Sequence, residues 1–203
     1  MPSASATPQT PDERLLDATG WGGDVDEVAQ ALRDGANPNA RQPGTWDGCT
    51  ISSIMGVSGH TALHQAIDRH SFVDESTEDQ TALVRLLLDH GADPNQWSNE
   101  NTPLGHAASS GSGEVVALLL ERGAGKSVLE RDTHWGRTPL EAAIVAHESH
   151  EADSSSLKTI ADAKLAVDLL RAATRQALAE QQAVLHAAAG EVSGGNRGAH
   201  RRL

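Results

Sequence analysis

The chain has 203 residues, of which 38% are hydrophobic and 2% aromatic, with no tyrosine and one phenylalanine. A large core built on aromatic side chains is therefore not expected, and many small alanine and leucine contacts must supply the stability. The formal net charge of −12 argues against nucleic acid as a partner, because phosphate binding needs a cationic face. The same charge favours a basic protein partner, which an acidic body attracts at long range.

Cys49 is the only cysteine, so neither an internal disulfide nor a metal site built from cysteines is expected. Residues 1–9 are rich in serine, proline, threonine and alanine, which predicts disorder, and they lack the features of a secretory signal. No stretch has the length needed to cross a bilayer. We therefore expect a cytoplasmic monomer that makes no contact with membranes. Thirteen arginines against three lysines are typical of a GC-rich bacterial genome.

The first predicted element begins with a capping box, in which Thr10 and Glu13 flank Pro11. A helix should start there and carry Leu15 and Leu16, and Trp21-Gly22-Gly23 should form the turn after it. Residues 24–34 then predict a second helix, which Gly35 ends. This short helix pair is typical of the end unit of a repeat array.

Residues 99–124 contain the clearest helix pair of the chain. Thr102 is predicted to cap a short helix with Pro103 in its first turn, where the missing N–H costs nothing. Gly111 and Gly113 separate this helix from a second one, which Gly123 ends in the left-handed conformation. Two such short helices cannot bury their apolar faces alone, so the unit needs similar neighbours.

Similar units are present on both sides. Residues 61–67 read Thr-Ala-Leu-His-Gln-Ala-Ile and residues 138–144 read Thr-Pro-Leu-Glu-Ala-Ala-Ile, while the second-helix pattern of residues 28–39 recurs at 84–95. The chain thereby resembles the ankyrin-repeat proteins, whose repeat of about 33 residues carries a Thr-Pro-Leu-His-x-Ala signature. The match covers residues 15–170. It departs from the pattern at Gly105 and Glu141, which replace the motif histidine.

The resemblance implies an all-α solenoid of four helix pairs joined by β-turn loops, which we call fingers. The expected repeats are residues 10–41, 57–97, 98–130 and 131–189, within one domain of residues 10–189 and before a flexible tail of residues 190–203. Because no glycine stop follows Leu170, the final helix, which begins near Leu157, should run on to residue 189 and cap the last repeat.

Three segments are longer than the ordinary repeat allows. Residues 42–58 should lengthen one finger, with the apolar stretch 51–57 folded back on the helices. Residues 70–79 and 147–156 should lengthen two turns between paired helices, with the helix after the first turn spanning residues 80–90.

The tryptophans are the informative residues for function, because three of the four fall in the predicted fingers. In ankyrin-repeat proteins the variable finger positions commonly contact partners, and tryptophan and arginine are enriched in interface hot spots. The alternative is that each tryptophan only packs on its neighbouring finger. The residues that the resemblance places at a protein-binding surface are Trp46, His60, Trp97, Asn99, Asn101, His134, Trp135 and Arg137.

The histidines suggest no chemistry. His147 and His150 are three residues apart, whereas the zinc-protease motif needs two histidines four apart on one helix face. His64 occupies the motif position that in the family hydrogen-bonds to the backbone of the neighbouring repeat, and His106 is expected at a groove. We expect no catalytic residue, no metal and no cofactor.

The sequence therefore predicts a non-catalytic protein-binding module that uses a concave surface of fingers and inner helices. A narrower alternative is an immunity or antitoxin-like inhibitor, which would mask a basic toxin or enzyme with its acidic face. A remote alternative is a metal-binding or enzymatic protein built on the histidine-rich final unit.

Overall fold

The computed structural model describes residues 9–20, 24–42, 59–68, 77–98, 101–153 and 156–195. The helices in these ranges are α1 (Pro11–Gly20), α2 (Val25–Arg33), α4 (Ala62–Asp68), α5 (Thr77–Asp89), α6 (Pro103–Ser109), α7 (Gly113–Glu121), the 3-10 helix η2 (Ala124–Ser127), α8 (Pro139–Ala152) and α9 (Leu157–Gly195). The β-type pairing found in the same ranges is a single antiparallel bridge between Arg41 and Thr61.

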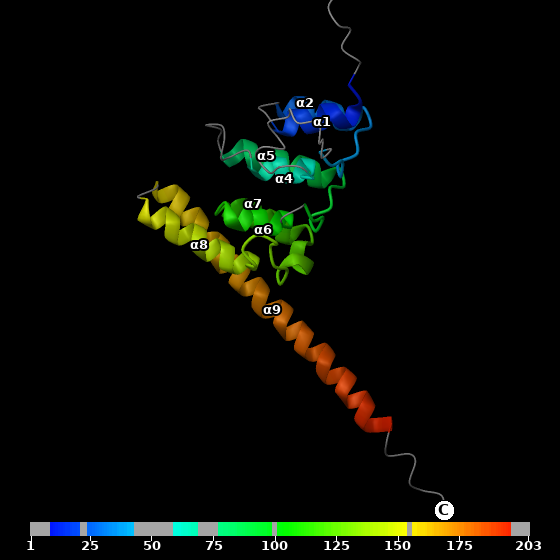
Figure 1. Cartoon of the computed structure of the whole chain (residues 1–203), viewed down its shortest axis with the longest axis vertical. Coiled ribbons are helices and arrows are strands. Elements are labelled where there is room, and N and C mark those ends of the chain that lie inside the picture. The colour runs from blue at the N-terminus through cyan, green and yellow to red at the C-terminus, as the bar shows by residue number, and fades with distance from the viewer. Residues whose placement is uncertain are drawn as a thin grey trace, which may run out of the picture.

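The helices form two parallel rows. Helices α1, α4, α6 and α8 contact one another in that order and make the inner row, while α2, α5, α7 and α9 make the outer row. Each inner helix also packs on the outer helix that follows it in the chain. Figure 1 shows this stack from α1 and α2 at one end to α8 and α9 at the other. The predicted all-α solenoid of stacked helix pairs is confirmed.

Three outer helices end as the sequence indicates. Gly35, Gly91 and Gly123 follow α2, α5 and α7 with φ angles of +93°, +91° and +95°. These values lie in the left-handed region, which glycine adopts without a steric cost and other residues rarely do. The chain therefore turns away from the outer row at the same place in each of these repeats.

Asparagine side chains join consecutive repeats just after these glycines. Asn39 Nδ2 donates to the carbonyl of Gly91 at 3.1 Å, and Asn95 Nδ2 donates to the carbonyl of Gly123 at 3.0 Å. The hydroxyl of Ser127 donates in turn to Asn95 Oδ1 at 2.7 Å. Each asparagine thus satisfies backbone groups that the end of the next outer helix leaves without a partner.

The core is aliphatic and runs along the whole stack. Alanines such as Ala66 and Ala107 are fully buried where inner helices meet, which lets neighbouring helices approach closely. The largest buried apolar side chains are Leu15, Leu63, Ile67, Leu83, Leu87, Leu104, Leu119 and Leu170.

The structure differs from the sequence-based expectation in the lengths of three helices. Helix α5 begins at Thr77 instead of residue 80, and α8 continues to Ala152, so most of the extra segment 147–156 is helical instead of a turn. Helix α9 extends to Gly195, six residues past the predicted end. No glycine or proline lies between Pro139 and Ala152 to end α8 earlier.

The last helix caps the stack only with its first half. Ala163, Ala166 and Leu170 are fully buried against the preceding helices, whereas Leu178, Val184 and Leu185 are exposed. Figure 1 shows the second half of α9 running away from the other helices. The expectation that residues up to 189 cover the last repeat is thus met only as far as the first half of the helix.

Two predicted features concern residues that the structure does not describe. The fold-back of residues 51–57 and the first turn extension at residues 70–76 lie outside the described residues, as do residues 1–8 and 196–203. Among the helices that are described, none is both long and apolar enough to span a membrane.

Candidate protein-binding groove

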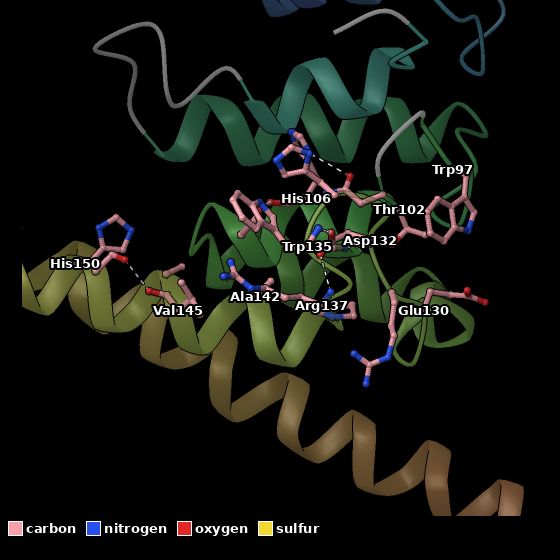
Figure 2. A pocket seen from close by; sticks show the side chains of 18 residues that line it. Trp97, Thr102, His106, Glu130, Asp132, Trp135, Arg137, Ala142, Val145 and His150 are labelled. Carbon is pink, nitrogen blue, oxygen red and sulfur yellow. Dashed lines mark hydrogen bonds between the residues drawn. The ribbon is translucent and has the colours of Figure 1, made fainter. Parts of the chain in front are cut away.

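A groove of about 330 Å³ lies on the inner side of the last two repeats. Its walls are the finger of residues 130–137, the inner helices α6 and α8, and the chain around Trp97 and Asn101. Figure 2 shows Trp97 and His150 at opposite ends of this groove, with Trp135 and Arg137 between them. The groove is therefore a long surface feature shared by two repeats.

One carboxylate holds the finger in shape. The Oδ1 atom of Asp132 accepts the backbone N–H groups of Trp135 and Gly136, and its Oδ2 atom accepts that of Arg137 at 3.0 Å. The backbone N–H of Asp132 donates to the carbonyl of Arg137 at 2.9 Å, and Gly136 has a φ of +65°. The finger is consequently a closed turn whose backbone groups are satisfied from within.

The pKa of Asp132 reflects this arrangement. Burial raises the pKa of the carboxyl, but the backbone N–H donors of Trp135, Arg137, His134 and Gly136 outweigh burial and hold it below its ordinary value of 3.8. The carboxylate is therefore charged at neutral pH, and its oxygens bind backbone N–H groups within the finger.

The finger presents an aromatic and cationic cluster to the groove. Trp135 is 68% exposed, and the imidazole of His134 meets its ring edge-to-face with the centroids 4.5 Å apart. The guanidinium carbon of Arg137 lies 5.2 Å from the centroid of the Trp135 ring, within the range of a cation–π contact. His134 and Arg137 thus fix the orientation of the Trp135 ring, although most of this residue is exposed to water.

The floor of the groove is apolar and begins at the capped end of α8. The hydroxyl of Thr138 accepts the Glu141 backbone N–H, and Glu141 Oε2 accepts the Thr138 N–H at 2.8 Å, which completes a capping box. The Thr138 backbone N–H is also the main reason that the pKa of Glu141 lies below its ordinary value. From this fixed start α8 places Ala142 and Val145 along the groove.

Five of the predicted binding residues line this one groove: Trp97, Asn101, His134, Trp135 and Arg137. His60 does not, because it is buried and its ring packs against the rings of His64 and His106. Trp46 and Asn99 lie outside the described residues. The two tryptophans also differ, since Trp97 is half-buried while Trp135 is exposed.

Sequence reasoning missed two residues that shape the groove. Asp132 organises the finger, and Arg131 joins the finger to α8 by donating to the carbonyl of Gly136 and to the Glu141 carboxylate at 3.2 Å. The signal for Asp132 was present, because an aspartate three residues before Trp135 and four before a glycine is typical of a side-chain-stabilised turn.

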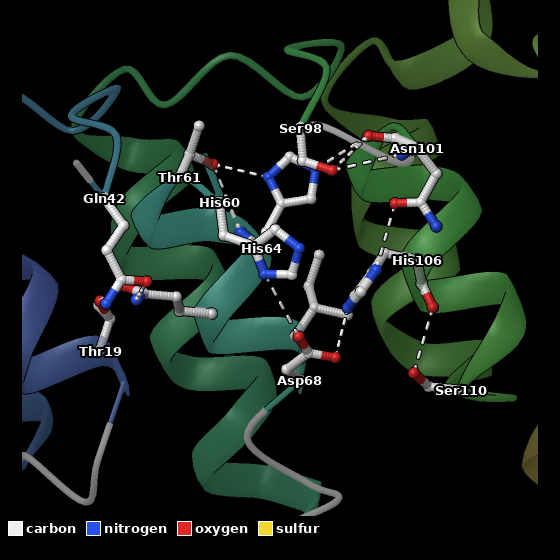
Figure 3. Close-up of polar contacts among 12 residues, drawn as sticks. Thr19, Gln42, His60, Thr61, His64, Asp68, Ser98, Asn101, His106 and Ser110 are labelled. Carbon is white, nitrogen blue, oxygen red and sulfur yellow. Dashed lines mark hydrogen bonds and ion pairs between the residues drawn. The ribbon is translucent and has the colours of Figure 1, made fainter. Parts of the chain in front are cut away.

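A cluster of three histidines lies behind the groove. The rings of His60, His64 and His106 lie with their centroids 5.4 to 5.9 Å apart. The carboxylate of Asp68 contacts His106 Nε2 and lies 3.6 Å from His60 Nδ1, as Figure 3 shows. His106 also lines the groove, so the cluster supports one of its walls.

His64 joins two repeats, as its motif position indicates. Its Nδ1 atom lies 2.8 Å from the Thr61 hydroxyl, and its Nε2 atom lies 3.3 Å from the carbonyl of Asn101 in the following repeat. Burial lowers the pKa of His64 well below 6.5, and the neighbouring His106 and His60 lower it further. The ring is therefore neutral at physiological pH.

The histidines of α8 are arranged differently. His147 Nδ1 lies 3.7 Å from the Glu151 carboxylate one turn along the helix, and His150 lines the end of the groove. Within the described ranges, no group of three or more histidine, cysteine, aspartate or glutamate side chains has the geometry to hold a metal ion.

The stacked helix pairs and the groove along their inner edge define a helical-repeat solenoid protein. The sequence matches the family described as Ankyrin repeats (3 copies) over residues 74–152. It is 41% identical over 75 residues to ankyrin repeat and MYND domain-containing protein 1 of Homo sapiens, a stretch that covers 37% of this chain and 8% of that protein. An ankyrin repeat protein of Fowlpox virus (strain NVSL) is 36% identical over 87 residues, or 42% of this chain and 8% of the relative.

Over residues 74–152, this chain is therefore similar to the ankyrin-repeat family. The matched stretch spans less than a tenth of the length of these curated relatives. Ankyrin repeats generally mediate protein–protein interaction and are typically non-catalytic. Helices α1, α2, α4 and α9 lie outside the matched residues, but they continue the same stack. Helices α1 and α2 pack on α4 and α5, and α9 packs on α7 and α8.

Proposed function

We propose that this chain is a non-catalytic module that binds a segment of a protein partner in the groove between the finger of residues 130–137 and helices α6 and α8. The observation that carries the proposal is that Trp135 is both exposed to water and held in a fixed position. A tryptophan that is 68% exposed contributes little to folding, yet Asp132 and Arg137 fix its position at the groove. An aromatic anchor that is already ordered loses little entropy when a partner covers it.

The groove supplies the other contacts that such a partner would need. Ala142 and Val145 offer an apolar floor to a side chain of the bound segment, and Asn101 and His134 offer hydrogen bonds at the rim. Trp97 closes one end of the groove. An apolar centre with a polar rim is the usual composition of a protein interface.

The charges favour a partner that is basic overall but presents a carboxylate or a backbone carbonyl to the groove. The net charge of −12 attracts a basic protein over long distances. Inside the groove, Asp132 is occupied by backbone N–H groups and Arg131 by Glu141, whereas the guanidinium of Arg137 lies against the face of Trp135 in the part of the chain that the structure describes. Arg137 is therefore suited to bind a carboxylate or a backbone carbonyl of the bound segment.

Selection of peptides from a random phage-displayed library tests this proposal. The selected peptides should carry an apolar residue near an acidic one, because the groove offers an apolar floor beside Arg137. The dissociation constant of a selected peptide should rise at least about tenfold in Arg137→Gln, since a charge-assisted contact contributes about 1.5–3 kcal/mol.

The matched control is Arg122→Gln, which removes the same charge from the end of α7, where Arg122 pairs with Asp89 at 2.6 Å. Peptide affinity in this variant should equal that of the unmodified chain. A library that yields no binder, or a selected peptide whose affinity falls equally in both variants, would contradict binding at the groove.

A further inference from the structure

In its second half, α9 runs away from the other helices of the stack, as Figure 1 shows. From Arg175 to Ala188 every side chain is exposed except that of Ala177, which is half-buried. At 1.5 Å per residue, the segment from residue 175 to Gly195 is about 30 Å long. A helix of this length is marginally stable in water unless its apolar face packs on something.

The apolar face of this segment continues the face that α9 buries in the stack. Eighteen residues are five full turns of an α-helix, so residues 18 apart lie on the same side. Ala166, Val167 and Leu170 are buried against the other helices, and five turns later the same positions are occupied by Val184, Leu185 and Ala188. Val184 is 68% exposed and Leu185 is 63% exposed. The buried stripe of α9 therefore extends, uncovered, beyond the end of the stack.

This stripe is complementary to itself when two copies run in opposite directions. With Gln181 at the centre, Ala177 of one copy meets Leu185 of the other, and Leu178 meets Val184. The first pair sets a small side chain against a large one, the second brings two branched aliphatic side chains together, and the two Gln181 amides can pair at the centre. A central polar residue of this kind fixes the register of a helix pair.

Charge favours the same arrangement. Between Ala172 and Ala188 the only formally charged residues are Arg175 and Glu180, although the whole chain carries a net charge of −12. Two copies can therefore approach along this segment without the repulsion that their acidic bodies would produce. An antiparallel pair also places the two bodies at opposite ends.

We propose that the exposed half of α9 binds the same segment of a second copy of this chain, and that the protein is an antiparallel dimer through residues 174–188. This differs from the monomer expected from the sequence, and it does not depend on the proposed function of the groove. The dimer would carry two grooves on opposite sides of a two-fold axis.

Sedimentation equilibrium of the full chain over a range of concentrations tests the dimer. The unmodified protein should form a dimer, and Leu185→Glu should raise the dissociation constant at least about a hundredfold, because each copy then buries a charge without a partner. Ala183→Glu adds the same charge to the opposite side of the helix and should leave the dissociation constant unchanged. A monomer at every concentration, or a dimer that Leu185→Glu does not weaken, would overturn the proposal.

Cysteine cross-linking tests the direction and register of the pair. In a Cys49→Ser background, Gln181→Cys places two thiols on the two-fold axis and should give a disulfide-linked dimer on mild oxidation. Ala183→Cys, on the far side of the helix, should not. Equal cross-linking of the two variants, or none of Gln181→Cys, would overturn the antiparallel pairing. Both positions lie beyond the stack, so circular dichroism should show the same helix content for each variant.

Discussion

The His64 side chain is fully buried between α4 and the segment that leads into α6, and both ring nitrogens have a partner. In the tautomer with a proton on Nε2, the ring donates to the carbonyl of Asn101 and accepts the hydroxyl hydrogen of Thr61 at Nδ1. This neutral form satisfies one backbone group of the next repeat. Protonation would place a charge beside His60 and His106 in a buried site, which is why the pKa of His64 is lowered.

The lowered pKa predicts that the fold loses stability in mild acid. Because the folded state binds a proton at His64 less readily than the unfolded state does, the stability from this group is complete above pH 6.5 and decreases as the pH falls below it. The decrease is at most about 1.4 kcal/mol per pH unit for one proton. Thermal melting at pH 7.5 and 5.5 should show the loss, and the difference should be smaller in His64→Gln. Equal differences in the two proteins would contradict this account of His64.

At the scale of the helices, the contact between α7 and α9 depends on a residue without a side chain. A Cβ atom at Gly113 would lie 2.3 Å from the backbone carbonyl oxygen of Asp162, a distance at which the two helices must separate. The Asp162 side chain also accepts the backbone N–H of Glu114 at 3.1 Å, next to the same point. The last outer helix is therefore positioned by a close backbone approach at the start of α7.

Gly113→Ala should lower the free energy of unfolding by about 1–3 kcal/mol, because the added methyl group overpacks a backbone contact. Gly125→Ala is the control, since a Cβ there would meet nothing within 4 Å. Denaturant unfolding of the two variants measures the difference. If Gly113→Ala were as stable as Gly125→Ala, α9 could not be docked on α7 as the structure has it.

The sequence was sufficient for the elements whose ends depend on local signals. The glycines after α2, α5 and α7 and the threonine caps of α6 and α8 act through backbone conformation and neighbouring hydrogen bonds, which residue type alone indicates. The sequence predicts a longer turn at residues 147–156, by comparison with the shorter repeats, whereas α8 continues to Ala152. A polar segment without a helix breaker can continue a helix, and its length depends on what it packs against.

Part of the groove could also be predicted from the position of residues within the repeat. The resemblance placed Trp97, Asn101, His134, Trp135 and Arg137 in fingers, and these residues do line one groove. Their different exposures could not be predicted, because exposure depends on how neighbouring fingers pack. His60 shows the limit of reasoning from position in the repeat, since its place next to Thr61 turns its side chain toward His64 and His106 instead of the surface.

At the scale of the whole molecule, the stack separates folding from binding. Each repeat contacts only its neighbours, so stability comes from aliphatic residues distributed along the array. The proposed binding residues lie on a finger and on the inner helix faces of the last two repeats, and the exposed one among them, Trp135, adds little to that core. A change at the exposed part of the groove should therefore alter affinity without altering the fold.

The two groove tryptophans make this separation measurable. Trp135 is exposed, so Trp135→Ala should leave the melting temperature within about 2 °C of the unmodified chain, as surface substitutions do. Trp97 is half-buried, so Trp97→Ala should lower both the melting temperature and the affinity. This contrast provides an internal control for the effect of lost packing.

The central claim is that Trp135 serves binding, and it is tested most directly by measuring melting temperature and affinity for a selected peptide on the same preparation of Trp135→Ala. The account predicts a dissociation constant raised about thirtyfold or more, which corresponds to the hot-spot range of about 2 kcal/mol, with an unchanged melting temperature. A lower melting temperature with unchanged affinity would contradict the account and would show that Trp135 only packs on its finger.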